Sequence, residues 1–533
     1  MLTRILLVLS AVSSAHGLNI ALFAPHMANS QIVWNKRVGE TLAAAGHNVT
    51  VYVLSMFDHN EPWVVEFDEK IHLEFVNATT GINGTELLQF QAQIAFQNIP
   101  LWDKRYREAM SRFGQMWKHC HSLVHNATFL DHVRASKFDV AFPHMYNFCT
   151  IGIIHATNIP SWIWLNSAAL LDNVASTVGV PVPPSYCPPL MMDAGDDLSF
   201  FERTKSFIGH AIYKATWPRF VVAPETKAFR EAFGDDFPAL VDLATKAPLV
   251  MVNSNEMYDF PRPTLAKVVN IGGVGVKKTN SKPLAKEYAD RVASAKDGII
   301  VMSFGSVAPM YLMPESWKDS YFNAFRKFPN VQFFLRYEHP DEIASLLPPN
   351  AYASKWLPQN DLLHHPKALG LISHGGYNSL QDVIHAGVPI LATALFGDQF
   401  RNAHLAVRLG LGIKLDKDDV NGESVEIGVR RLIEDRSLKE AAVRIRGMVA
   451  TRPVSSETLL VRWTEFVAQH KVLDNLIPPV AEMSWFVYHS LDVITFLTLV
   501  VLGVLGIVFA ILRCCFRCVC RCCSSPGDKV KTQ

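Results

Sequence analysis

Residues 18–54, LNIALFAPHMANSQIVWNKRVGETLAAAGHNVTVYVL, predict the fold of the amino-terminal half. Leu18 to Ala24 is an apolar run of strand length, and the pattern of Ile32 to Ala45 predicts a helix that ends at Gly46. Val49 to Leu54 is a second apolar run of strand length. A strand, a helix and a second strand in this order are typical of a parallel sheet with crossover helices.

The same alternation returns in the second half of the chain, after a break near Pro261-Arg262-Pro263 and a polar stretch up to Asp297. Further strands are expected at residues 138–143, 249–253, 298–304, 331–336, 368–373 and 389–394. The predicted fold class is therefore α/β, with two doubly wound, Rossmann-like domains. We expect the first domain over residues 18–270, a linker over 271–296, the second domain over 297–450 and a helical region over 451–490.

Both ends of the chain carry targeting signals. Arg4, an apolar run and Ala15-His16-Gly17 predict a signal peptide over residues 1–17, rather than a buried first strand. Residues 493–512 carry no charge, and twenty residues at about 1.5 Å each span the roughly 30 Å core of a bilayer. A buried core helix is the alternative, but the basic residues that follow favour a transmembrane helix over residues 491–512.

The basic residues Arg513, Arg517, Arg521, Lys529 and Lys531 set the expected orientation of this helix. The positive-inside rule places the tail, residues 513–533, in the cytosol and the large front part in the lumen. Lysines at the third and fifth positions from the end resemble a dilysine retrieval signal. We therefore expect a single-pass protein of the endoplasmic reticulum membrane.

Composition narrows the choice of partners. The chain has 50 basic and 49 acidic residues, so neither its charge nor any charge run indicates nucleic-acid binding. Candidate N-glycosylation sites at Asn48, Asn77, Asn83 and Asn126 fit a lumenal front part. Asn48 opens a strand-like run, so we expect it to be poorly accessible.

The cysteines fall into two groups. Only Cys120, Cys149 and Cys187 precede the membrane helix, so at most one internal disulfide is possible there. The other six lie between Cys514 and Cys523. Acylation and unmodified thiols in a reducing compartment both remain open for these six. A zinc site is not expected, because no histidine or second cysteine cluster accompanies them.

The densest chemical signal is residues 356–402, WLPQNDLLHHPKALGLISHGGYNSLQDVIHAGVPILATALFGDQFRN. Residues 368–373 predict a strand, His374-Gly375-Gly376 a tight turn, and Asn378-Ser379 the start of a helix. The free N–H groups and the dipole at a helix start favour a phosphate, to which His374 can add a donor. Each piece has a plainer reading: Ser379 and Asp382 fit a capping box, and a lone Trp356 is usually a core residue.

The combination of these pieces with Asp398-Gln399 after the next strand resembles the animal membrane-bound UDP-glucuronosyl/glucosyltransferases. The resemblance extends to Gly46-His47, to residues 258–263, to Ser303-Phe304-Gly305-Ser306 and to residues 488–493. It implies two Rossmann-like domains that face a cleft, the GT-B arrangement, and it implies a UDP-sugar as donor.

The resemblance also implies roles for individual residues. Trp356 would stack on the uracil ring, Gln359 would bond near the ribose or base, and Asp382 would hold the ribose hydroxyls, where relatives usually have Glu. The diphosphate would be held by His374, Gly376, Asn378, Ser379 and Ser306, and the sugar hydroxyls by Asp398 and Gln399.

The implied reaction is attack of an acceptor hydroxyl on the anomeric carbon, with inversion and release of UDP. It requires no metal and no cofactor, and Asp416-Lys417-Asp418 is expected to be a solvated loop or helix start. The expected partners are a UDP-sugar, a small lipophilic acceptor, membrane lipid and, as an open possibility, a homo- or hetero-oligomer. The sequence does not decide between glucuronate and glucose as the donor sugar.

Two other functions compete with transfer. An inactive homologue would bind UDP-sugar and regulate partner transferases. A membrane receptor or lipid carrier would use the amino-terminal pocket alone, and the intact block at residues 356–402 argues against it.

The catalytic base departs from the family pattern. Relatives carry a histidine in the loop after the first strand, oriented by an acidic residue at the end of a later strand; these positions fall on Gln31 and His144. An amide cannot serve as a base near neutral pH. We therefore expect His144 to face the cleft and act as the base, with Gln31 orienting it and His26 as the second candidate. An inactive protein is the alternative.

Overall fold

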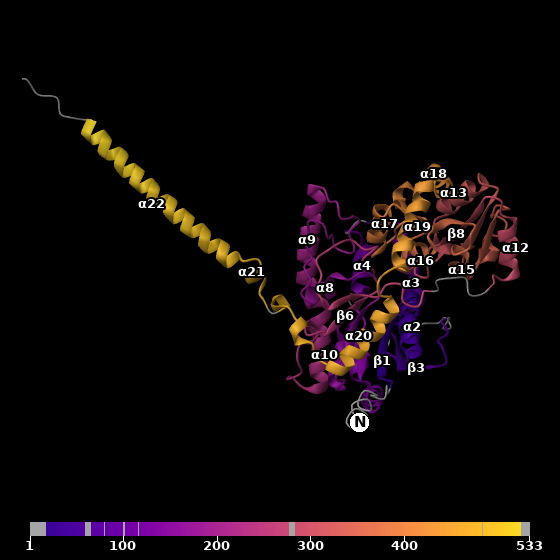
Figure 1. Cartoon of the computed structure of the whole chain (residues 1–533), viewed down its shortest axis with the longest axis horizontal. Coiled ribbons are helices and arrows are strands. Elements are labelled where there is room, and N and C mark those ends of the chain that lie inside the picture. Colours follow the sequence, from indigo (N-terminus) through magenta and orange to yellow (C-terminus); the bar gives the residue numbers. More distant parts are fainter. Residues whose placement is uncertain are drawn as a thin grey trace, which may run out of the picture. The chain divides into compact units, whose positions relative to one another are not determined.

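The computed structural model describes residues 17–58, 65–78, 80–99, 102–113, 115, 117–276, 283–481 and 483–523 (Figure 1). The predicted signal peptide and the dilysine signal lie outside these residues, apart from Gly17. The chain divides into two compact units, one that ends at Ile477 and one that begins at Pro478.

The amino-terminal sheet starts with the predicted strand–helix–strand unit. Strand β1 (Asn19–His26) pairs in parallel with β2 (Asn48–Ser55), and helix α2 (Asn29–Ala44) connects them. The helix begins three residues before the predicted start. Gly46 has φ +95°, a conformation that glycine adopts without a Cβ penalty, and it turns the chain back into β2.

Two parallel sheets follow one another in this half. The first has the order β3-β2-β1-β4 and the second β5-β6-β7, and isolated bridges at Ala141↔Trp162 and His144↔Leu165 join β4 to the second sheet. The strands are β3 (Ile71–Asn77), β4 (Val140–Phe142), β5 (Ile163–Asn166), β6 (Leu249–Val252) and β7 (Val268–Asn270). The helices are α3 (Gly84–Ala95), α4 (Lys104–Phe113), α5 (Trp117–Val124), α6 (Ala127–Ala135), α7 (Cys149–Ala156), α8 (Asp172–Thr177), α9 (Phe200–Trp217), the π-helix η1 (Pro218–Val222), α10 (Ala223–Phe233) and α11 (Leu240–Thr245).

A six-stranded parallel sheet forms the second half of this unit, with the order β10-β9-β8-β11-β12-β13. The strands are β8 (Gly298–Ser303), β9 (Val331–Arg336), β10 (Ala351–Ser354), β11 (Ala368–Ser373), β12 (Ile390–Ala392) and β13 (Gly412–Lys414). The helices are α12 (Lys286–Ser294), η2 (Met310–Leu312), α13 (Glu315–Arg326), α14 (Pro340–Ile343), α15 (Gln359–Leu363), α16 (Tyr377–Ala386), α17 (Gln399–Arg408), η3 (Lys417–Asp419), α18 (Gly422–Glu434) and α19 (Arg436–Ala450). The order reverses between β8 and β11, and ligands of doubly wound sheets bind beside such a reversal, at the carboxyl ends of the strands.

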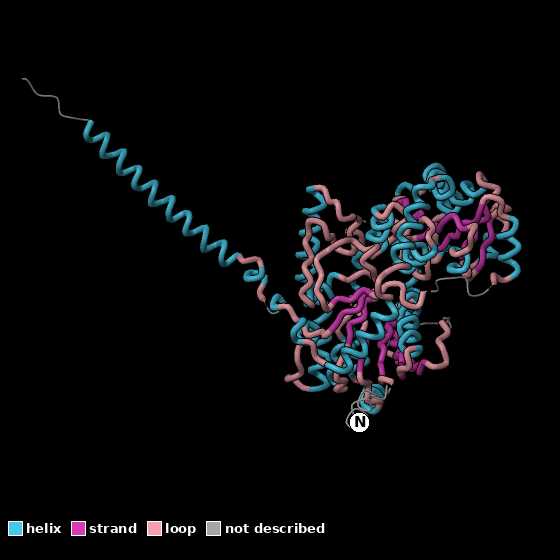
Figure 2. The backbone as a smooth tube through the Cα atoms, in the orientation of Figure 1, coloured by secondary structure: helices cyan, strands magenta, loops and turns pink. Residues whose placement is uncertain are grey.

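Figure 2 shows the strands of both halves enclosed by helices. The predicted α/β class with two doubly wound regions is confirmed. The chain then returns to the first half, because α20 (Ser456–His470) packs on α2 and buries Leu460 and Val467 in the core of β1 and β2. Helix α20, in the first part of the expected helical region, is thus part of the amino-terminal core, whereas residues 478–490 belong to the second unit.

The second unit contains η5 (Pro479–Ala481), α21 (Trp485–Tyr488) and the long helix α22 (Leu491–Cys523). Residues Leu491–Arg521 are long and apolar enough to cross a membrane, with a mean hydropathy of 2.8, and none of the most apolar window is buried. The alternative of a buried core helix is therefore wrong.

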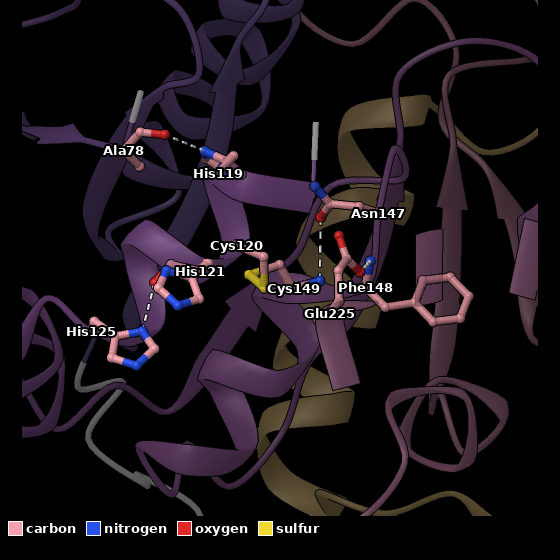
Figure 3. The surroundings of a disulfide bond; sticks show 9 residues. All are labelled: Ala78, His119, Cys120, His121, His125, Asn147, Phe148, Cys149 and Glu225. Atoms are coloured by element: carbon pink, nitrogen blue, oxygen red, sulfur yellow. Dashed lines mark hydrogen bonds between the residues drawn. A yellow bond between two sulfur atoms is a disulfide. The ribbon is translucent and has the colours of Figure 1, made fainter. Parts of the chain in front are cut away.

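A disulfide joins α5 to α7 through Cys120 and Cys149, whose Cα atoms lie 5.5 Å apart (Figure 3). Cys187 is buried and free, so the limit of one disulfide before the membrane helix is confirmed. Asn48 is exposed, and the expectation that it is poorly accessible is wrong. Glycosylation of the four asparagines stays a prediction.

Candidate active site

The predicted phosphate turn lies at the reversal of the six-stranded sheet. Strand β11 ends at Ser373, Gly375 turns with φ +78°, and α16 starts at Tyr377 with Gly376 as its N-cap. No side chain caps this helix, so the alternative of a capping box at Ser379 and Asp382 is wrong. The N–H groups at the start of α16 can therefore bind an anion.

The imidazole of His374 lies against two glycines, Gly376 in the same turn and Gly305 in the loop after β8, and leaves no room for a Cβ at either position. A Cβ on Gly376 would lie 2.5 Å from His374 Nε2, and one on Gly305, which has φ +74°, would lie 2.7 Å from Cε1. Gly305 and the half-buried Ser306 follow β8, the strand next to β11. Two loops from neighbouring strands thus meet at the imidazole.

Burial lowers the pKa of His374 to about 4, against a backbone hydrogen bond with Ser303 that raises it. The imidazole is therefore neutral at pH 7 while no anion is bound. A diphosphate beside it favours the protonated form, in which both ring nitrogens donate.

Trp356 is 60% exposed, so it is not a core residue. Its backbone oxygen accepts hydrogen bonds from the hydroxyls of Tyr288 (3.0 Å) and Ser354 (3.0 Å), which fix the loop that carries it. The guanidinium of Arg336 lies over the ring at 5.5 Å. An anchored, exposed indole provides the flat face that a planar base needs for stacking.

Asp382 is only 9% exposed and lies on α16 beside α15. Its Oδ2 accepts a hydrogen bond from Gln359 Nε2 (2.9 Å), whereas Oδ1 has no hydrogen-bond partner among the described residues. Burial raises the pKa of Asp382, and the guanidinium of Arg37, on α2 in the other half, opposes the rise. A buried carboxylate oxygen without a partner is suited to accept a ligand hydroxyl. Gln359 and Asp382, both expected near the ribose, are thus in contact, and Arg37 was not foreseen.

Hydrogen bonds from Asn402 connect the loop before α17 to the phosphate turn. Asn402 Nδ2 donates to the Gly375 carbonyl (3.0 Å) and to Asp398 Oδ2 (3.0 Å). Burial raises the pKa of Asp398, although the bond from Asn402 lowers it. Gln399 Oε1 accepts from the backbone N–H groups of Leu395 and Phe396, so this oxygen shapes the loop and does not face a ligand.

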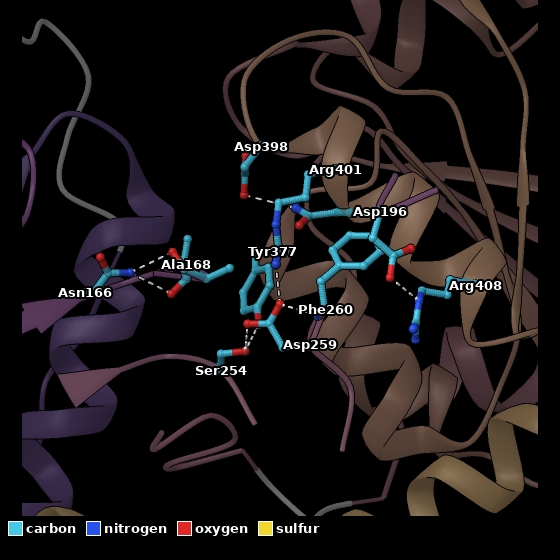
Figure 4. Close-up of polar contacts among 12 residues, drawn as sticks. Asn166, Ala168, Asp196, Ser254, Asp259, Phe260, Tyr377, Asp398, Arg401 and Arg408 are labelled. Carbon is cyan, nitrogen blue, oxygen red and sulfur yellow. Dashed lines mark hydrogen bonds and ion pairs between the residues drawn. The ribbon is translucent and has the colours of Figure 1, made fainter. Parts of the chain in front are cut away.

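Buried polar contacts connect the two halves behind this site (Figure 4). Arg401 on α17 pairs with Asp259, which follows β6, and Ser254 donates to the same carboxylate (2.6 Å). The Tyr377 hydroxyl donates to Ser254 (2.7 Å). Burial opposes the ionisation of Asp259, yet Arg401 holds its pKa below the usual value. The start of α16 is therefore held against the amino-terminal half.

Two guanidinium groups near this connection keep buried nitrogens without partners among the described residues, Arg401 Nη1 and Arg262 Nη2. Arg401 lies one turn after Asp398 on the same helix. Arg401 therefore keeps a hydrogen-bond donor of positive charge near Asp398, a residue of the predicted sugar site.

Comparison with known proteins identifies this architecture. The family model described as "UDP-glucoronosyl and UDP-glucosyl transferase" matches residues 21–529. The chain belongs to this family. It is 31% identical over 498 residues to human UDP-glucuronosyltransferase 2B7, covering 91% of this chain and 90% of that one. Human UDP-glucuronosyltransferase 1A5 is 33% identical over 399 residues, covering 74% and 72%.

Solved structures confirm the fold of this UDP-glycosyltransferase. The glycotransferase of kitacinnamycin superposes with a TM-score of 0.56 at 16% identity, covering 86% of this chain and 100% of the other. The glycosyltransferase VinC, solved in complex with dTDP, gives a TM-score of 0.54 at 14% identity, covering 85% and 100%. The protein is therefore an enzyme of GT-B fold that transfers a sugar from a UDP-sugar to an acceptor. Family membership and the apolar helix α22 together indicate a single-pass membrane protein.

The structure corrects the expected catalytic pair of this transferase. His144 is only 4% exposed, and its Nδ1 accepts the backbone N–H of Tyr146 (3.2 Å), so the proton of the neutral ring is on Nε2. Nε2 has no hydrogen-bond partner among the described residues, and burial together with His119 lowers the pKa of His144 to about 3. The expectation that His144 faces the cleft with Gln31 orienting it is wrong, because its only lone pair is used inside the fold.

The side chain of Gln31 instead lies next to the hydroxyl of Tyr146. The Tyr146 hydroxyl is within hydrogen-bonding reach of Ser167 and Gln31, and the charge of Asp398 is near enough to affect it. Burial raises the pKa of Tyr146 well above its usual value. Sequence reasoning missed Tyr146, whose hydroxyl meets Gln31 on α2 and lies near the charge of Asp398 before α17.

His26 ends β1 and is half-buried, three residues before α2. The carboxyl end of β1 lies between those of β2 and β4, at the edge of the sheet where ligands bind in doubly wound folds. Of the two histidines considered for the base, His26 is the more exposed.

Proposed function

We propose that the protein transfers a hexosyl or hexuronosyl group from a UDP-sugar to a hydroxyl of a small lipophilic acceptor, with inversion at the anomeric carbon. The observation that carries the proposal is the uncapped start of α16 beside His374 and Gly375-Gly376. Charge that builds on the leaving diphosphate is stabilised there by backbone N–H groups and by the imidazole.

The nucleotide would lie with its base on Trp356 and its ribose hydroxyls on Asp382. The unpartnered Oδ1 of Asp382 supports this placement. Asp is one methylene shorter than the Glu expected from relatives. Gln359 holds this shorter side chain in place by donating a hydrogen bond to Oδ2.

The buried donors of Arg401 and Arg262 support a hexuronosyl donor, whose carboxylate carries the opposite charge. A lipophilic acceptor is supported by the helix α22, because an enzyme anchored in a bilayer meets apolar compounds at high local concentration.

The test is UDP release by the full-length protein in detergent with UDP-glucuronate, UDP-glucose and a panel of phenols. We expect turnover with at least one pair, and the proton coupling at the anomeric carbon of the product should show the β configuration from an α-linked donor. An α-linked product would disprove inversion. Binding of UDP-sugar without turnover would instead fit the inactive, regulatory homologue.

We propose His26 as the general base, since the lone pair of His144 is occupied within the fold. His26→Ala should lower kcat about 10²- to 10⁴-fold and leave UDP binding unchanged. His144→Asn is the matched control, because its side-chain oxygen can still accept the Tyr146 N–H, and it should keep near wild-type kcat. Loss of turnover in His144→Asn but not in His26→Ala would restore His144 as the base.

We propose that the enzyme resides in the endoplasmic reticulum with its catalytic part in the lumen. The basic residues after the apolar stretch of α22 support this orientation. The lysines at positions 529 and 531 support residence in the endoplasmic reticulum. Protease should digest a carboxyl-terminal tag in intact microsomes but leave the catalytic part protected. Glycans that stay sensitive to endoglycosidase H after Lys529→Ser and Lys531→Ser would exclude a retrieval role for the lysines.

A further inference from the structure

Helix α22 does not end where its apolar stretch ends. The uncharged residues stop at Leu512, but the helix continues through Arg513 to Cys523. Cys514, Cys515 and Cys518 in this extension are free and exposed, and Cys520 is exposed as well. With Cys522 and Cys523, six of the eleven residues from Arg513 to Cys523 are cysteines. The side chains that the structure describes here, Arg513 to Arg521, are all exposed, so burial in a core does not explain this density.

Helix geometry places these thiols at the membrane surface. At a rise of about 1.5 Å per residue, Cys514 lies about 3 Å and Cys523 about 16 Å beyond Leu512 along the helix axis. If residues 493–512 span the hydrocarbon core, the first thiols lie at its edge and the last ones remain within the headgroup region or just outside it.

The cysteines and arginines follow separate stripes. Cys514 and Cys518 are four residues apart and thus about 40° apart around the axis, and the same spacing continues at Cys522. Arg513, Arg517 and Arg521 repeat with the same spacing, one position earlier. Cys515 falls on the same side as these three cysteines, whereas Cys520 and Cys523 fall on the other side of the arginines. Four of the six thiols therefore share one side of the extension, and the adjacent side carries guanidinium groups suited to lipid phosphates.

Other uses of these cysteines fit less well. No group of three metal-ligating side chains occurs in the part of the chain that the structure describes. Cys514, Cys515 and Cys518 form no disulfide, and in the proposed orientation the tail lies in the reducing cytosol.

We propose that this juxtamembrane segment is a site of S-acylation by long-chain fatty acyl groups. The cysteine sulfur attacks the thioester carbonyl of a long-chain acyl-coenzyme A, a new C–S bond forms, and the C–S bond of the donor breaks. The thiol proton passes to the leaving coenzyme A, so no oxidant or reductant is needed. The acyl chains insert into the same leaflet beside α22, and the arginine stripe attracts the phosphates of the acyl donor and of the lipids.

The test is metabolic labelling of cells that express the full chain with an alkynyl analogue of palmitate. We expect a label that hydroxylamine removes, as it cleaves thioesters. Replacement of all six tail cysteines by serine should abolish the label, whereas Cys187→Ser, which changes a buried cysteine of the first unit, should keep it. Exchange of acyl groups for a polyethylene-glycol mass tag should give several shifted bands for the wild type and none for the six-serine variant.

An unlabelled wild-type protein, or a label that persists in the six-serine variant, would overturn the proposal. Turnover of UDP-sugar in detergent should be the same for the wild type and the six-serine variant. The labelling experiment therefore tests acylation independently of the proposed transfer reaction. Equal expression of both proteins and protease access to a carboxyl-terminal tag in intact microsomes serve as controls.

Discussion

Replacing Glu225 by glutamine should stabilise the protein at neutral pH. Glu225 lies on α10 and is completely buried, with Oε2 accepting the Phe148 N–H (3.0 Å) at the start of α7, next to the disulfide (Figure 3). Its Oε1 has no partner among the described residues, and burial raises its pKa to about 8. Glutamine has the same shape, keeps an acceptor for Phe148 and cannot ionise.

The direction in which the stability changes with pH follows from the number of protons that the folded and the unfolded protein bind. In the folded protein the carboxyl stays protonated up to about pH 8, whereas in the unfolded chain it ionises near its ordinary value of 4.5. Unfolding between these values releases a proton, so the stability that Glu225 provides is complete below pH 4.5 and is lost as the pH rises toward 8. At roughly 1.36 kcal/mol per pH unit, the loss at pH 7 amounts to about 3 kcal/mol. Glu225→Gln avoids this loss.

The assay compares thermal unfolding of the full-length wild type and Glu225→Gln in detergent from pH 4.5 to 8. The two Tm values should agree near pH 4.5 and diverge as the pH rises, by about 2–4 °C per kcal/mol for a unit of 150–250 residues and by less for a larger one. His119 and His144 titrate in the opposite sense, because burial lowers their pKa values to about 4 and 3, so they cost stability as the pH falls below 6.5. Both proteins contain these histidines, and the difference between them isolates Glu225.

Glu231→Gln is the matched control on the same helix, since Glu231 is exposed and forms an ion pair with the exposed Lys227. It should not change the pH dependence. A difference between wild type and Glu225→Gln that stays constant from pH 4.5 to 8 would refute the reasoning, as would a less stable Glu225→Gln at pH 7.

Three further predictions concern the site and the fold. Trp356→Ala should weaken UDP binding roughly 5- to 150-fold, since stacking of a base on an aromatic ring contributes about 1–3 kcal/mol, and calorimetric titration with UDP measures it; unchanged affinity would remove the indole from the site. Gly376→Ala should abolish UDP binding, because its Cβ would lie 2.5 Å from His374 Nε2, and Gly422→Ala, with nothing within 4 Å of the added Cβ and no positive φ, is the matched control. Cys120→Ser with Cys149→Ser should lower the stability by about 3 kcal/mol, because the disulfide closes a loop with a sequence separation of 29; a reducing agent should lower the Tm of the wild type but not of the variant.

The geometry of the candidate phosphate turn was predictable because its parts are contiguous in sequence. Strand β11, the turn at His374 and the start of α16 follow one another within a few residues, and two glycines mark the turn. Local geometry alone therefore places the N–H groups of α16 at the carboxyl edge of the sheet. The transmembrane helix was predictable for the same reason, since length and apolar composition decide it.

The acceptor half depended on residues far apart in the chain. His144 has the sequence position of a cleft residue, yet it is buried and its Nδ1 accepts the Tyr146 N–H, and Gln31 bonds to Tyr146 instead. Arg37 reaches Asp382 from the opposite half. Position along a strand determines which end of the sheet a side chain occupies, and that much the sequence determined by itself. Whether the lone pair of such a side chain faces solvent or accepts a backbone N–H is decided only by the elements that pack over it. Burial and hydrogen bonding are set by long-range contacts, which local periodicity does not encode.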